Sequence, residues 1–129
     1  MDDAFMFYGF ACGVVKLDGY ELIEIIEDIE SLNKRALNAE LEATALSAHA
    51  YGYVSDRYYV LSSGSSMGYS YGPIIVARAP FSIKDLKSKV IGIPGKLTTA
   101  YLLLRLALGD VKVAEMKFDL ILDAVVRGY

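Results

Sequence analysis

The stretch that decides the fold is "VIGIPGKLTTAYLLLRLALG", residues 90–109. Its opening apolar run predicts a buried strand, Pro94 and Gly95 predict a turn, and the apolar residues that follow predict a helix. Thr98 is of the residue type that caps helix N-termini, and Gly109 is of the type found where helices end. A strand that turns directly into a helix is typical of proteins with a parallel sheet.

The same alternation continues on both sides of this stretch. After it, "VKVAEM" (111–116) predicts a strand and "FDLILDAVVRG" (118–128) predicts a helix. Before it, "PIIVARA" (73–79) predicts a buried strand and "SIKDLKSK" (82–89) a short helix capped by Ser82. Strands that alternate with helices at such short intervals predict an α/β fold with mainly parallel strands.

The first half of the chain leaves one segment ambiguous. Asp2 or Asp3 can cap a first helix that ends near Gly13. The segment that follows fits either one amphipathic helix over 21–38 or a strand over 20–27 and a helix over 29–38 capped by Asp28. Further along, the patterns predict strands at 41–48 and 58–63 and a short helix at 50–56.

Composition excludes several classes of function. The 13 basic and 16 acidic residues give a net charge of −3, which disfavours a nucleic-acid partner. Cys12 is the only cysteine, so no internal disulfide or cysteine-based metal site is expected. A reduced, cytoplasmic setting is expected instead. The longest apolar run, residues 100–108, is interrupted by Arg105 and is far shorter than the roughly 20 residues that cross a bilayer. The acidic start shows no secretory signal.

Two motifs are candidates for chemistry, and each has an ordinary structural interpretation. His49, the only histidine, could act as a general base or could be a strand-end histidine satisfied by a local hydrogen bond. With no second histidine, a metal site there is not expected. "PGKLTTA" (94–100) places hydroxyls and N–H groups at the positive end of a helix, which can bind carboxylates or phosphates, although any capped helix shares this pattern.

Five blocks in order resemble the 1,4-dihydroxy-6-naphthoate synthase family of the futalosine route to menaquinone. They are "DDAFMFYG" (2–9), "EDIESLNKRAL" (27–37), "LSAHAYGYV" (46–54), "SSGSSMGYSYGPIIVAR" (62–78) and "IPGKLTTAYLLL" (93–104). The resemblance implies an α/β, periplasmic-binding-protein-like (type II) architecture with two lobes. Residues 1–72 would form the first lobe without its first strand, and 73–129 the crossover and part of the second. It also favours the strand at 20–27 and the helix after Asp28.

The resemblance implies a substrate site and a reaction. The substrate contacts would be Ala45, Leu46 and Ser47 on the first lobe, and Thr98, Thr99 and Ala100 at the helix start on the second. Asn33 could close the pocket with its amide, or that amide could be solvated on a helix face. The reaction would convert cyclic de-hypoxanthine futalosine, a small-molecule carboxylate, to 1,4-dihydroxy-6-naphthoate by a lyase mechanism without metal or cofactor.

Two departures from the family pattern qualify what this chain would do. Family members usually have a strand ahead of the "DDAF" helix, and their proposed base is a histidine expected beyond Tyr129, so His49 is not expected to be that base. We therefore expect the 129 residues alone to be inactive and to self-associate through unpaired strand edges. The alternatives are a chorismate dehydratase-like enzyme of the same pathway and a small-carboxylate solute-binding protein.

Overall fold

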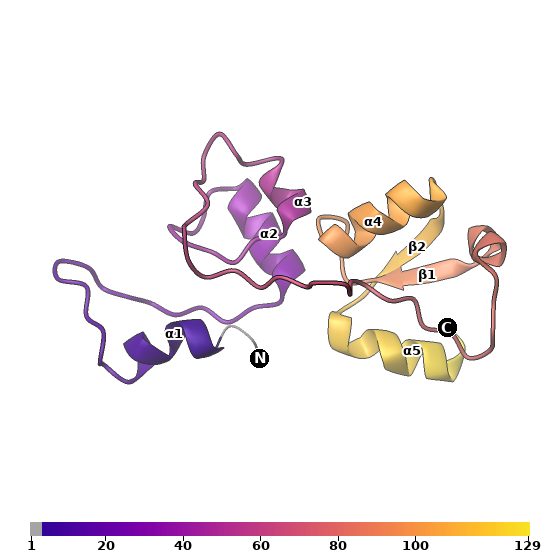
Figure 1. The fold of residues 1–129 in the computed structure, drawn as a ribbon, viewed down its shortest axis with the longest axis horizontal. Coiled ribbons are helices and arrows are strands. Elements are labelled where there is room, and N and C mark those ends of the chain that lie inside the picture. Colours follow the sequence, from indigo (N-terminus) through magenta and orange to yellow (C-terminus); the bar gives the residue numbers. More distant parts are fainter. Residues whose placement is uncertain (1–3) are drawn as a thin grey trace. The chain divides into compact units, whose positions relative to one another are not determined.

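The computed structural model describes residues 4–129, with side chains from residue 7 onward. In order, its elements are α1 (Ala4–Ala11), α2 (Ile29–Leu37), α3 (Ala48–Tyr51), the 3-10 helix η1 (Ile83–Ser88), β1 (Val90–Ile93), α4 (Thr99–Leu108), β2 (Lys112–Glu115), the 3-10 turn η2 (Phe118–Leu120) and α5 (Ile121–Arg127) (Figure 1). Contacts group the chain into two units. The first combines the chain up to Ile26 with Val60–Tyr71, and the second combines Glu27–Tyr59 with Gly72–Tyr129. The lobes 1–72 and 73–129 are a different grouping and stay a prediction.

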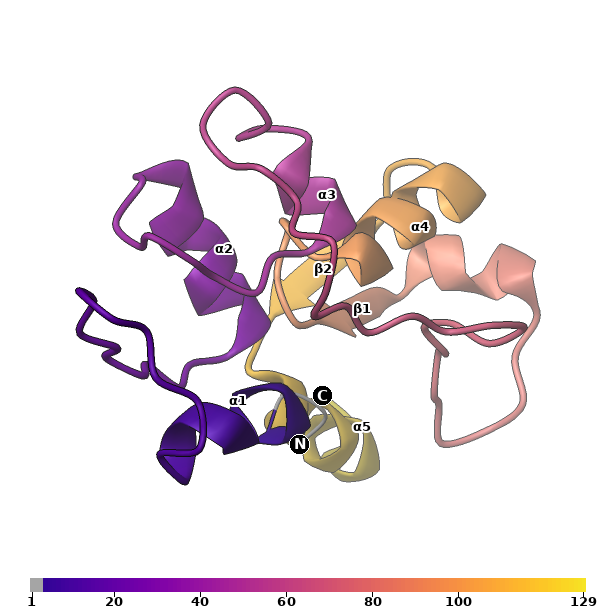
Figure 2. The same ribbon diagram turned by 60° about the vertical axis from the view of Figure 1, so that its left-hand side comes forward.

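The second unit contains a parallel pair of strands. β1 and β2 pair with Val90 opposite Lys112 and Ile93 opposite Glu115, and α4 connects them. α4 lies on one face of this pair and α5 on the other, as two views show (Figure 2). The expected strand, turn, helix and strand over 90–116 are therefore confirmed, and the unit has α/β character.

The core lies between the sheet and its helices. Leu86 of η1, Ile93 of β1, and Leu104 and Leu108 of α4 are buried together. Around them pack the partly buried side chains of Ile91, Tyr101, Val111 and Val113. This core fixes α4 against the sheet, and the turn over residues 94–98 joins the end of β1 to the start of α4.

Helix α2 begins where one of the two interpretations put it. The Asp28 carboxylate accepts hydrogen bonds from Glu30 N and Ser31 N at 3.1 Å each, so Asp28 is the N-cap, and the helix starts at Ile29 instead of residue 21. The Ser31 hydroxyl also donates to Asp28 over 2.6 Å. This bond favours the charged form and lowers the pKa of Asp28 below its usual value.

We expect Asp28→Ala to lower the free energy of unfolding by about 0.5–2 kcal/mol, because two N–H groups lose their acceptor. Asp28→Asn is the control, since asparagine caps about as well.

Because the folded-state pKa of Asp28 is lowered, the charged cap stabilises the protein above the unfolded-state pKa, and this stabilisation is lost as the pH falls through the folded-state pKa. Urea unfolding of the three proteins at neutral and acidic pH measures both effects, and equal stabilities of all three at neutral pH would contradict the assignment.

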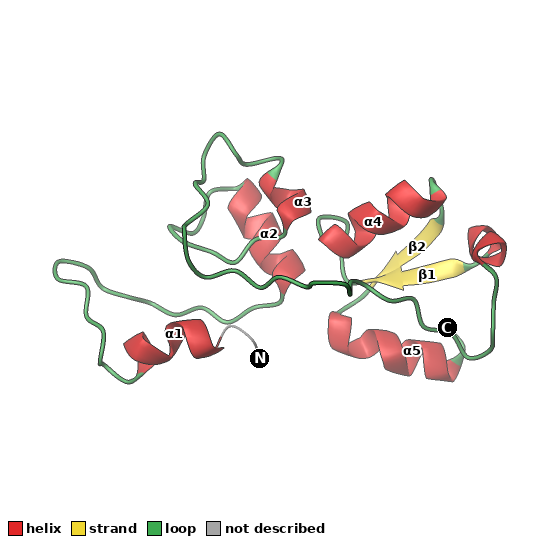
Figure 3. Cartoon of the chain, viewed as in Figure 1, coloured by secondary structure: helices red, strands yellow, loops and turns green. Residues whose placement is uncertain are grey.

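Four of the predicted strands do not form. Residues 20–27, 41–48, 58–63 and 73–79 contain no strand, and most of these segments are drawn as loops (Figure 3). A strand exists only when its N–H and C=O groups pair with a neighbour, and β1 and β2 are the only paired strands among residues 4–129. A segment with the apolar pattern of a strand but no neighbouring strand to pair with is therefore a loop in this structure.

The helix predictions agree with the structure more closely than the strand predictions do. The short helix expected at 50–56 forms two residues earlier, as α3, and continues in turns. Ser82 lies at the N-cap of η1, where its N and Oγ donate to the Asp85 carboxylate at 2.9 and 2.8 Å. Gly109, with φ +74°, ends α4 as expected. The predicted caps Asp2 and Asp3 lie outside the described residues.

Candidate functional site

Thr98 caps the start of α4. Its hydroxyl donates to the Gly95 carbonyl over 2.7 Å and accepts from Tyr101 N at 3.3 Å, so the predicted cap is confirmed. Thr98 is only 4% exposed, and its hydroxyl already has a donor and an acceptor partner within the protein. A direct contact between this hydroxyl and a ligand stays a prediction.

The next two backbone groups are open donors. Within residues 4–129, the N–H groups of Thr99 and Ala100 meet no acceptor, as is general for the first turn of a helix. Both residues are half-buried. The partial positive charge of the helix N-terminus adds to these two N–H groups. These two N–H groups can donate hydrogen bonds to two oxygens of an anion.

Ser47 is held by Asn33 through a reciprocal pair of hydrogen bonds. Asn33 Nδ2 donates to Ser47 Oγ, and Ser47 N donates to Asn33 Oδ1, both over 3.0 Å. Asn33 is 0% exposed, so the interpretation that its amide is solvated on a helix face is wrong. Because Ser47 Oγ accepts from Asn33, its own proton has no protein acceptor in the described part of the chain and can be donated to a ligand.

His49 joins α3 to the start of α4. Its Nδ1 lies 3.2 Å from the Thr98 carbonyl oxygen, and its backbone N donates to Thr99 Oγ1 over 3.5 Å. Its Nε2 lies 3.3 Å from the Tyr53 hydroxyl. His49 is therefore in a helix rather than at a strand end, and both ring nitrogens have partners. Through these contacts, Ser47 and Thr99 lie on neighbouring helix starts.

The other predicted contacts lie just before α3. Ala45 is exposed and Leu46 is half-buried, both in the loop that leads to Ser47. The Ala45 carbonyl accepts from the Thr44 hydroxyl over 2.9 Å. The structure thus brings Asn33, Ser47 and Thr99 into one region, with Ala45 and Leu46 adjoining along the chain, while ligand contact by any of them stays a prediction.

Sequence reasoning missed Glu30. Glu30 is 5% exposed, and its carboxylate accepts from Leu97 N at 3.1 Å and lies 3.7 Å from Lys34 Nζ. Gly95 makes this possible, because a Cβ at position 95 would collide with the Glu30 side chain. The Pro-Gly pair was a visible signal for the turn, whereas nothing in the sequence linked a helical glutamate 65 positions earlier to it.

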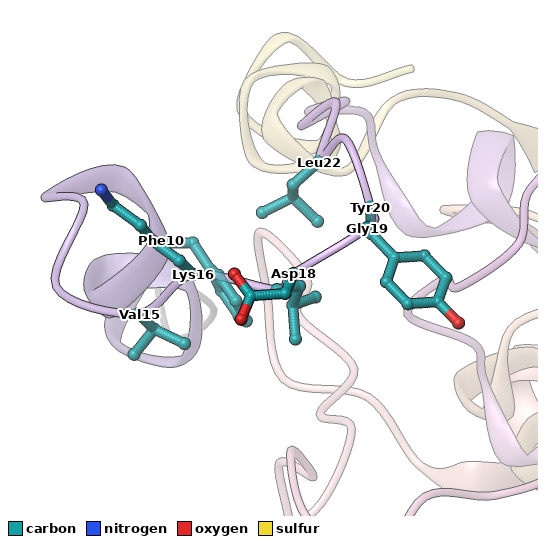
Figure 4. A pocket seen from close by; sticks show the side chains of 8 residues that line it. Phe10, Val15, Lys16, Asp18, Gly19, Tyr20 and Leu22 are labelled. Atoms are coloured by element: carbon teal, nitrogen blue, oxygen red, sulfur yellow. The ribbon is translucent and has the colours of Figure 1, made fainter.

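A hollow lies in the first unit, lined by residues other than those of the predicted site. Phe10, residues 15–20 and Leu22 line a space of about 390 Å³ (Figure 4). Lys16 and Asp18 supply its charges. None of the predicted site residues belongs to it. Among the described residues, no three histidine, cysteine or acidic side chains gather as a metal site would need, and no helix has the length and hydropathy to span a membrane.

Comparison with known proteins gives the relatives of the chain. It is 39% identical over 127 residues to a 1,4-dihydroxy-6-naphtoate synthase from Thermus thermophilus, and 29% identical over 134 residues to a protein of the same name from Streptomyces coelicolor. A crystal structure of a protein from Archaeoglobus fulgidus superposes with a TM-score of 0.89 at 49% sequence identity. Each comparison covers 98% of this chain and 46% of the other protein, so the chain spans about half the length of these relatives.

The family comparison covers the chain from end to end. The model of a family described as menaquinone biosynthesis matches residues 1–129. The Thermus relative exceeds 30% identity over nearly the same residues. The chain therefore belongs to the menaquinone biosynthesis family.

Proposed function

We propose that this chain carries the carboxylate-binding side of a 1,4-dihydroxy-6-naphthoate synthase. The observation that carries the proposal is the set of open donors: the N–H groups of Thr99 and Ala100 and the Ser47 hydroxyl lie on adjoining helix starts. A carboxylate only accepts hydrogen bonds, so it suits a site made only of donors. The relatives named for this synthase make the naphthoate carboxylate the first ligand to consider.

The reaction that we propose is a lyase step of the futalosine route. A base removes a proton from cyclic de-hypoxanthine futalosine, and the electron pair left behind expels the sugar-derived group, so that the bicyclic ring becomes aromatic. The chain described here would bind the carboxylate and orient the ring for that step, which is a positioning role. His49 is not proposed as the base, because Thr98 and Tyr53 occupy its two nitrogens.

The larger architecture is part of the same proposal. We propose that the βαβ unit of β1, α4 and β2 belongs to the second lobe of a periplasmic-binding-protein-like fold, and that α2 and α3 belong to the first. Ligands of open α/β sheets collect beyond the carboxyl ends of the strands, and five residues separate the end of β1 at that edge from the start of α4. The cytoplasmic location expected from the sequence stays a prediction.

The test is product formation by the protein translated from its complete reading frame, whatever that adds to these 129 residues. Cyclic de-hypoxanthine futalosine and chorismate are offered separately, and chromatography follows the loss of each substrate and the release of its product. Conversion of the first compound alone supports the proposal. Conversion of chorismate alone, or binding of carboxylates without any turnover, would replace it with a dehydratase or a solute-binding protein.

Thr99→Val should weaken binding of 1,4-dihydroxy-6-naphthoate by about 1–3 kcal/mol, the usual loss when a hydroxyl bonded to a charged group is removed. Valine keeps the shape of the side chain and leaves the helix N–H groups in place. Ser88→Ala is the control, since that hydroxyl donates to the Asp85 carbonyl in η1. Calorimetric titration measures both, and unchanged affinity in Thr99→Val would remove this hydroxyl from the site.

A further inference from the structure

His49 makes an ordered set of contacts that the proposed binding role does not yet use. The Thr98 carbonyl oxygen, 3.2 Å from Nδ1, can only accept, so Nδ1 must carry the proton. In the neutral ring Nε2 is then an acceptor, which fits the Tyr53 hydroxyl at 3.3 Å as donor. The contacts thus select one tautomer of His49.

The peptide unit that His49 holds is the one that presents the Thr99 N–H. The Thr98 carbonyl and the Thr99 N–H are the two ends of a single planar trans peptide, so they point in opposite directions. A donor that fixes the carbonyl therefore fixes the direction of the N–H. Hydrogen bonds linked through one peptide also polarise each other, so the bond from His49 makes the Thr99 N–H a better donor.

The Thr98 carbonyl receives a second bond from inside the helix. Leu102 N donates to it over 3.2 Å, as the first bond of α4. With His49 outside and Leu102 inside, both acceptor positions of this oxygen are used. The peptide is therefore held in place before any ligand arrives, which lowers the cost of ordering it on binding.

We propose that His49 is a positioning residue for carboxylate binding: its Nδ1–H orients and polarises the Thr98–Thr99 peptide so that the Thr99 N–H meets a carboxylate oxygen of the substrate. The proposal rests on the proposed function of this site. It assigns the single histidine a role in binding instead of proton transfer, and it predicts that the effect of His49 is specific to charged ligands.

The test compares three variants in the protein from its complete reading frame. His49→Ala removes the donor, His49→Asn keeps an N–H donor at the position of Nδ1, and His49→Gln places its amide at the position of Nε2. Tyr53→Phe is the matched control, because it removes the partner of Nε2 and leaves the bond to Thr98. Circular dichroism establishes that each variant is folded.

The ligands are 1,4-dihydroxy-6-naphthoate and its primary amide, which has the same shape without the charge. We expect His49→Ala and His49→Gln to weaken naphthoate binding roughly 5- to 30-fold and to change amide binding far less. The naphthoate affinity of His49→Asn should stay close to that of the unaltered protein. Nitrogen-15 NMR should show a protonated Nδ1 and an unprotonated Nε2.

Each other outcome has its own meaning. Unchanged naphthoate affinity in His49→Ala, an equal loss for both ligands, or no recovery in His49→Asn would overturn the positioning role while the carboxylate site stands. If the unaltered protein binds neither ligand, the proposed function fails and the inference fails with it.

Discussion

Gly95→Ala is expected to lower the free energy of unfolding by about 2–4 kcal/mol, because the added methyl group overpacks a buried contact and displaces a carboxylate from its donor. The displaced group is Glu30, which lies against Gly95 and accepts from Leu97 N at 3.1 Å. With the carboxylate moved, the Leu97 N–H at the entry to α4 loses its acceptor. Urea unfolding measures the change.

Two controls isolate this contact. Gly72→Ala adds the same methyl group where no heavy atom lies within 4 Å, so its effect should stay within about 0.5 kcal/mol. In a Glu30→Ala background the collision partner is absent, and adding alanine at position 95 should then cost much less than it does alone. Equal effects of the substitutions at positions 95 and 72 would show that Glu30 does not lie against Gly95.

The second large effect concerns activity. The 129-residue chain alone is expected to form no detectable 1,4-dihydroxy-6-naphthoate, because both ring nitrogens of its single histidine already have partners, and the lack of a general base costs typically 10²- to 10⁴-fold in rate. The family resemblance implies a base other than His49, and the chain spans 46% of the length of its named relatives.

The assay compares the 129 residues with the protein from the complete reading frame, using the same substrate and following naphthoate release. Light scattering in parallel tests the self-association that the sequence predicts through unpaired strand edges. Exposed apolar side chains such as Ile23 and Ile26, 73% and 87% exposed, would also favour association. Strong activity of a short, monomeric chain would place the base within these residues, and His49 would become the first residue to mutate.

Local signals predicted the parts of the fold that depend on neighbours in sequence. The cap at Thr98 and the strand that leads into α4 follow from short-range chemistry, and both are present. The cap at Asp28 is also present, but local signals left it as one of two interpretations and the family resemblance favoured it. The strand predictions at 20–27 and 41–48 were wrong for this structure, because strands depend on a partner that no local pattern specifies.

The candidate site was predictable in its positions and less so in its connections. Thr99 and Ser47 were named from the sequence and the family resemblance, and the structure places them on neighbouring helix starts. The contacts of Glu30 with Leu97 and of His49 with Thr98 span 67 and 49 residues, so only the folded chain reveals them. These long-range bonds hold the open donors in place.

The most direct measurement is a crystal structure of the protein from the complete reading frame with 1,4-dihydroxy-6-naphthoate bound. We predict that a carboxylate oxygen lies about 2.7–3.1 Å from Thr99 N or Ala100 N, with the Ser47 hydroxyl also within reach of the ligand. A bound naphthoate whose carboxylate lies away from the start of α4, with the N–H groups of Thr99 and Ala100 still open, would contradict the account.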